Sequence, residues 1–186
     1  MDEEIRKALK SVSHTQMTEI WLKAKDRDFE GLDDEKRRIA KIMVEHEDDL
    51  SKQFEYAHLN YDPDQDPETE YDPFLHITIH AIVEAQLELA DPIELVQFFN
   101  AMRQKKYPRH DAIHLVGQIL IYLIFEMSEY QKPFDLDTYR KLLDKYKSCD
   151  PEALTDLLEN EPLLSDTDWA TQPRLVVVDP GHRMLY

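Results

Sequence analysis

Glycine is scarce in this chain, with three residues among 186. The phosphate-binding loops of nucleotide-dependent enzymes need several glycines at fixed spacing, because their backbone must approach the phosphates closely. Neither a Walker loop nor a dinucleotide-binding fingerprint can be written from the glycines present. We therefore expect no nucleotide cofactor.

Cysteine and long apolar runs are also lacking. The single cysteine, Cys149, cannot form an internal disulfide, which suits a reducing compartment. The longest apolar run, from Ile119 to Phe125, is too short to span a bilayer. The first residues are polar, so we expect no signal peptide. Together these features predict a cytoplasmic protein that does not enter a membrane.

Basic residues are outnumbered. The chain has 22 Lys and Arg against 39 Asp and Glu, which gives a net charge of −17. Such a chain repels nucleic acid backbones and anionic membrane surfaces. The densest basic clusters, at residues 36–38 and 103–106, are short. We expect no nucleic acid partner.

Helix signals dominate the rest of the sequence. Met17, Ile20, Trp21 and Ala24 follow the spacing of one helical face, and Asp-Pro pairs recur as helix starts. The segment 109–131 is apolar on most sides and is the expected central helix. The predicted fold is all-α, an antiparallel bundle of about six helices. Helices are expected over residues 3–28, 33–58, 73–90, 92–106, 109–131 and 135–147.

The C-terminal part of the sequence has a different character. We expect a helical domain over residues 1–149 and an extension over residues 150–186 made of a short helix, a loop and one strand. The strand candidate is the apolar run at residues 174–179. A lone strand needs a pairing partner, so a homodimer formed through this strand is a candidate assembly.

Histidine spacing is the most informative pattern in the chain. His76 and His80 are one helical turn apart, and so are His110 and His114. Side chains at this spacing project from one face of a helix and can bind one metal ion. Glu84 extends the first row by a further turn, and His46 lies within the apolar stripe of the helix expected over 33–58. These six residues are the predicted metal site, with zinc or iron as the candidate ions.

Two functional hypotheses follow from this site. In the first, the protein binds a metal, and Glu84 is either a ligand or a general base acting on metal-bound water. The catalytic residues, the reaction and the substrate are unknown in this reading. In the second, the protein is a non-catalytic interaction protein, and its buried histidines form a metal-free hydrogen-bond network.

The order of these motifs resembles that of a bacterial family known only as domain of unknown function 1841. The resemblance covers roughly residues 15–147. It is carried by Asp72-Pro73-Phe74-Leu75-His76 with His80, then Pro92, His110-Asp111-Ala112-Ile113-His114 and Tyr139. This chain has Gln118 where the family pattern has a glutamate. The resemblance therefore does not imply a symmetric site with two carboxylates in this chain. A looser similarity to hemerythrin-like bundles rests on the order of His46, His80, Glu84, His110 and His114.

Overall fold

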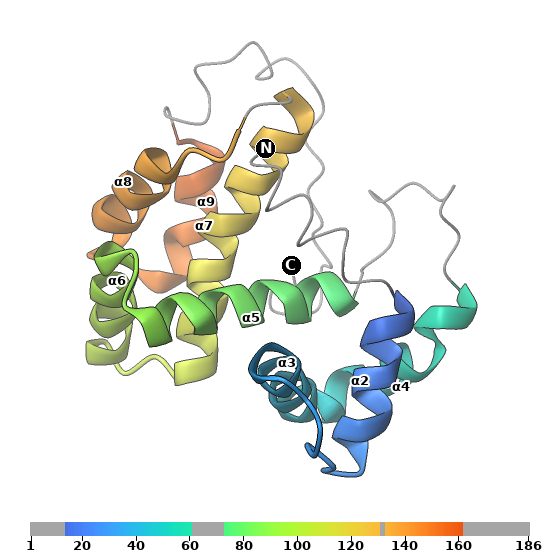
Figure 1. Cartoon of the computed structure of the whole chain (residues 1–186). Coiled ribbons are helices and arrows are strands. Elements are labelled where there is room, and N and C mark those ends of the chain that lie inside the picture. Colours follow the sequence, from blue (N-terminus) through green and yellow to red (C-terminus); the bar gives the residue numbers. More distant parts are fainter. Residues whose placement is uncertain (1–13, 61–72, 131–132, 162–186) are drawn as a thin grey trace. The chain divides into compact units, whose positions relative to one another are not determined.

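The computed structural model describes residues 14–60, 73–130 and 133–161, and all regular secondary structure in these residues is helical (Figure 1). This confirms the all-α prediction for the described part of the chain. The α-helices are α2 (His14–Lys25), α3 (Asp34–Glu45), α4 (Glu47–Asn60), α5 (Pro73–Leu89), α6 (Ile93–Gln104), α7 (Arg109–Tyr130), α8 (Leu136–Tyr146) and α9 (Leu154–Glu159), and a 3-10 turn, η1 (Pro151–Ala153), precedes α9.

The prediction of about six helices was too low, because the helix expected over residues 33–58 is divided into α3 and α4. The division falls at His46, whose backbone has φ −104° and ψ 10° and leaves the regular helical geometry. Its N–H still bonds the carbonyls of Ile42, at 3.1 Å, and Met43, at 3.2 Å. Periodicity continues across this break, so the sequence pattern did not reveal it.

The described chain forms two compact units, and the boundary between them falls within α5, between Ile82 and Val83. The first unit contains α2, α3, α4 and the first part of α5. The second contains the remainder of α5 and the helices from α6 to α9. Each unit has its own apolar core.

The core of the first unit is built from the inward faces of its helices. The predicted α2 stripe is confirmed, since Met17, Ile20, Trp21 and Ala24 are all buried. The Trp21 and Phe54 rings lie 5.1 Å apart, and Phe54 stacks on Phe74 at 5.9 Å. Burying each such ring stabilises the fold by roughly 1.5–3 kcal/mol. Phe74 thereby anchors the first turn of α5, the helix that carries His76 and His80.

In the second unit, α7 packs against α6, α8 and α9, which confirms its predicted central position. On α8, Tyr139, Leu142, Leu143 and Tyr146 are buried as expected, but Leu136 is 41% exposed. The helical spacing of these five apolar residues predicts that all of them face inward, and this prediction is wrong for Leu136. A helical stripe identifies the inward face, but it does not show how far along the helix the neighbouring helices reach.

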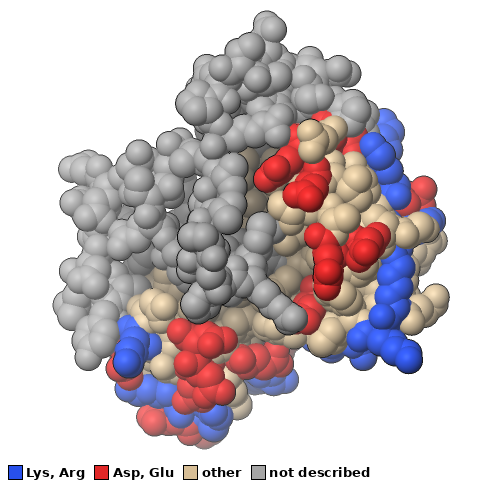
Figure 2. Space-filling view, turned by 180° about the vertical axis from the view of Figure 1, so that it is seen from behind, with Lys and Arg blue, Asp and Glu red and all other residues tan. Residues whose placement is uncertain are grey.

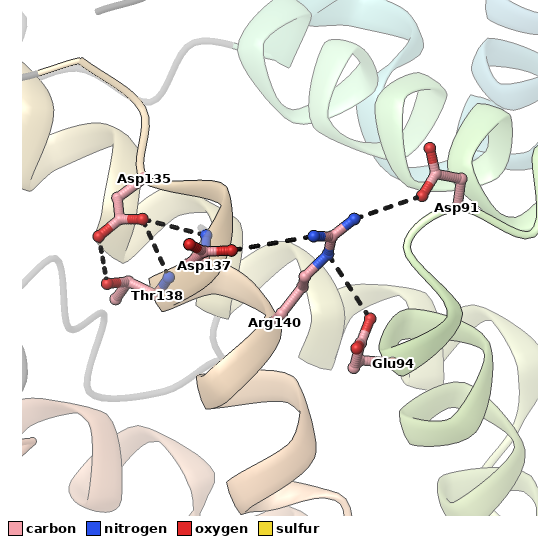
Figure 3. A network of polar contacts seen from close by, with 6 residues as sticks. All are labelled: Asp91, Glu94, Asp135, Asp137, Thr138 and Arg140. Atoms are coloured by element: carbon pink, nitrogen blue, oxygen red, sulfur yellow. Dashed lines mark hydrogen bonds and ion pairs between the residues drawn. The ribbon is translucent and has the colours of Figure 1, made fainter.

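Arg140 links α8 to the start of α6 (Figure 3). Its guanidinium lies 3.9 Å from the Asp91 carboxylate and 3.8 Å from those of Glu94 and Asp137. The sequence suggested that Asp91 caps a helix beginning at Pro92, but Pro92 itself is the N-cap and makes no side-chain capping bond. Because Arg140 is 40% exposed, each ion pair contributes less than about 1 kcal/mol.

The expected extension at residues 150–186 is described only as far as residue 161. Its α9 packs on α7. The strand expected at residues 174–179 lies outside the described residues, so the homodimer through it and the boundary at residue 149 stay predictions. Within the described ranges, no helix combines the length and the apolar character needed to cross a membrane.

Candidate metal centre

His46 ends α3 with its imidazole turned back onto its own helix. The ring is buried, and its Nδ1 lies 2.8 Å from the carbonyl oxygen of Ile42. A carbonyl oxygen can only accept a hydrogen bond, so Nδ1 carries the proton and donates. In a neutral imidazole the other nitrogen is then bare. The Nε2 of His46 therefore presents a lone pair.

His76 and His80 project from α5 beside this ring. Both are buried, each with 1% of its surface exposed. The His46 ring centroid lies 4.7 Å from that of His76 and 4.6 Å from that of His80, and the two α5 rings are 4.6 Å apart. We call these three residues the histidine cluster of the first unit. His46 therefore lies close to both histidines of α5.

A direct hydrogen bond joins two members of this cluster. The Nε2 atoms of His46 and His76 are 2.9 Å apart. One of the two must donate and the other accept, because two bare nitrogens or two N–H groups would repel each other at this distance. The protonation of His46 described above makes His76 the donor.

The second predicted pair lies on α7, in the second unit. His110 and His114 are partly buried, and their ring centroids are 4.3 Å apart, as expected for side chains one turn apart. Gln118 continues this row by another turn and is buried. Its Oε1 has no hydrogen-bond partner among the residues that the structure describes.

Glu84 lies on α5 in the second unit and is held by an arginine. Arg109 donates from both of its terminal nitrogens to the two carboxylate oxygens of Glu84, each at 2.5 Å. The Glu84 side chain is 14% exposed, so this two-pronged pair is partly shielded from water. Arg109 was missed at the sequence level, although its position directly before His110 was a usable signal.

The histidines whose ring nitrogens are candidate metal ligands are His46 and His80 in the first unit and His110 and His114 in the second. Imidazole nitrogens are common ligands of zinc, iron, nickel and copper. His76 and Glu84 are not in this set, and their predicted roles as ligands stay predictions. Their observed partners are His46 and Arg109, respectively.

No histidine stands near Cys149 in the sequence, which predicts an incidental thiol, and the surroundings of Cys149 fit this prediction. It is half-buried next to Lys105, whose ammonium group donates to the Cys149 carbonyl. Burial raises the pKa of the Cys149 thiol, and the Lys105 charge opposes this effect. A thiol with a raised pKa is a weak nucleophile at neutral pH.

The chain matches the model of a protein family over most of its length. The model of a family described as Domain of unknown function (DUF1841) matches residues 11–145. No curated protein and no solved structure matches the chain. The looser similarity to hemerythrin-like bundles is not shown by these comparisons.

Proposed function

We propose that this chain, which belongs to the DUF1841 family, binds one transition-metal ion through His46, His80, His110 and His114. Zinc and iron are the candidate ions. The proposal concerns metal binding and assigns no reaction to the protein.

The observation that carries the proposal is the orientation of His46. Metal-binding histidines almost always donate their second ring N–H to a carboxylate, a carbonyl or a water, which fixes the ring and its tautomer. His46 makes this bond to Ile42 at 2.8 Å in a buried setting. Its Nε2 therefore carries the lone pair with which the ring would bind a metal ion.

The continuity of α5 supports the joining of the two histidine pairs. His80 and Glu84 are one turn apart on the same face of this helix. Glu84 binds Arg109, the neighbour of His110 at the start of α7. His80 is thus one helical turn from the carboxylate that binds the chain neighbour of His110. We propose that all four rings meet on one ion.

The donor set indicates what such a site can do. Four imidazole nitrogens fill the tetrahedral shell of zinc, which is typical of structural sites, whereas catalytic zinc sites keep one position open. Both oxygens of Glu84 accept hydrogen bonds from Arg109, which does not favour a general base at this position. A zinc ion here would stabilise the fold, and an iron ion could accept further ligands.

The alternative is a metal-free protein whose histidines only order the core. The specific observation in its favour is the hydrogen bond between His46 and His76, which already uses the lone pair of His46. In this reading the protein is an interaction protein without catalytic activity.

A metal-binding experiment tests the proposal. The full chain, purified without an affinity tag, is stripped with a chelator and titrated with zinc against a chromophoric competitor. We expect one zinc per chain, with ligand nitrogens at about 2.0–2.1 Å by X-ray absorption. At a free zinc concentration of 100 times Kd, the free energy of unfolding should rise by about 2.7 kcal/mol.

Paired variants provide the control. Changing His80→Ala together with His114→Ala should abolish stoichiometric binding. Thr78→Ala removes a different hydrogen bond on α5, from Thr78 to the Phe74 carbonyl, and should leave binding unchanged. A wild-type chain that takes up neither zinc nor iron would leave the metal-free interpretation in its place.

A further inference from the structure

The proton positions in the histidine cluster have a consequence for the proposed site. The Nδ1–H of His46 donates to the Ile42 carbonyl, and in the neutral imidazole Nε2 then carries no proton. The Nε2 of His46 therefore has one lone pair, and the N–H of His76 points at it from 2.9 Å. A metal ion bound at this nitrogen would need the same lone pair.

One lone pair cannot accept a proton donor and bind a metal ion together. The bond from His46 to Ile42 lies on the opposite side of the ring and can persist in both states. The bond from His76 to His46 cannot, so metal entry must break it. The ring centroid of His80 lies 4.6 Å from those of His46 and His76. The exchange of the hydrogen bond for a metal ion would therefore take place among the three rings of the cluster.

We infer that His76 competes with the metal ion for the Nε2 atom of His46 and thereby sets the metal affinity, without being a ligand itself. This inference rests on the proposed function. In the metal-free protein, His76 satisfies the buried His46 lone pair and keeps the ring in place. When a metal ion binds, the ion takes over the lone pair and His76 is displaced. The two functional hypotheses then correspond to two states of one site.

The measurable consequence is an affinity that rises when His76 is removed. His76→Phe keeps a ring of similar size but has no N–H, so no hydrogen bond must be broken on metal entry. We expect zinc to bind about tenfold more tightly to this variant, the equivalent of about 1.4 kcal/mol, which is typical of one hydrogen bond. His76→Gln retains a side-chain N–H donor and should bind zinc with nearly the wild-type affinity.

The zinc titration separates the alternatives. Tighter binding by His76→Phe, with Thr78→Ala unchanged, supports the inference. Binding weakened by tenfold or more would identify His76 as a ligand, and unchanged binding would show that no competition exists, so either result overturns it. Failure of the wild-type chain to bind either zinc or iron would instead refute the proposed function.

A second measurement does not depend on the folding of a variant. Long-range ¹H–¹⁵N NMR spectra of the metal-free wild-type protein report which ring nitrogen carries the proton. We expect His46 protonated at Nδ1 and bare at Nε2, and His76 protonated at Nε2. Zinc should then change the His46 Nε2 resonance while its Nδ1–H persists. A proton on His46 Nε2 in the metal-free protein would overturn the inference directly.

Discussion

At the scale of single residues, the carboxylate of Glu161 is fully buried. The Lys145 ammonium group donates to its oxygens at 2.7 and 2.9 Å, and the Tyr146 hydroxyl donates to it as well. Both donors come from the end of α8. Burial raises the pKa of Tyr146, and the Glu161 carboxylate raises it further. The hydrogen bond to Glu161 also raises the pKa of Lys145.

The Tyr146→Phe variant should be less stable than wild type at pH 8, by about 1–2 kcal/mol, because a hydrogen bond to a charged acceptor is lost. The pKa of Tyr146 is raised in the folded state. The stability contributed by its hydroxyl is therefore fully present below about pH 10, the unfolded value, and is lost as the pH rises through the folded pKa.

Urea unfolding of both proteins at pH 8 and above pH 10 measures this change. The stability difference between wild type and Tyr146→Phe should shrink at the higher pH. A difference that stays constant across this range would contradict the assigned hydrogen bond.

At the scale of the helix, α8 begins with a complete cap (Figure 3). The Asp135 carboxylate accepts from the backbone N–H groups of Asp137, at 3.0 Å, and Thr138, at 3.2 Å. The Thr138 hydroxyl donates to it at 2.6 Å. The hydrogen bond from this hydroxyl is the largest effect that lowers the pKa of Asp135. The sequence predicted this helix start correctly, because Asp135 lies two residues after the break at Pro133.

The Asp135→Ala variant lacks this capping carboxylate and should be less stable than wild type by about 1 kcal/mol. The pKa of Asp135 is lowered on folding, so the charged cap contributes stability above about pH 4, the unfolded value, and loses it as the pH falls through the folded pKa. Asp135→Asn keeps an acceptor oxygen without the charge and should lose less stability at pH 7.

Thermal unfolding of the three proteins at pH 7 and at pH 3 checks this expectation. The stability difference between wild type and Asp135→Asn should narrow at pH 3. An equal loss in the Asn and Ala variants at pH 7 would argue that the capping geometry contributes nothing.

At the scale of the whole molecule, charge is the dominant property. The net charge is −17, and Asp and Glu side chains gather on the described surface with Lys and Arg beside them (Figure 2). A duplex carries one negative charge about every 1.7 Å, so binding needs Lys or Arg to replace its counterions. We propose that the protein has no nucleic acid partner.

Chromatography on immobilised DNA and RNA tests this proposal. At physiological ionic strength the full chain should appear in the flow-through, and a higher salt concentration should not change its elution volume. Retention that weakens steeply with salt would contradict it, because such a slope counts the phosphates neutralised by basic side chains.

The sequence by itself determined the helical elements and their inward faces. Helix starts depend on local chemistry, as at Asp33, whose carboxylate accepts from the Lys36 N–H at 2.8 Å. Inward faces depend on helical periodicity, which correctly identified the buried stripe of α2 and the burial of His46, His76 and His80. Both signals act within a few residues, so they can be read without knowledge of the fold.

Only the tertiary structure decided which side chains meet. The bond between His46 and His76 joins residues 30 positions apart, and the pair of Glu84 and Arg109 joins residues 25 positions apart. Glu161 lies beyond the last helix, where no periodicity marks it as buried. Periodicity tells which way a side chain faces, but its partner depends on how separate helices pack. The proton position of His46 follows from Ile42 on its own helix, but the side chain that meets its Nε2 comes from α5 and could not be read from the sequence.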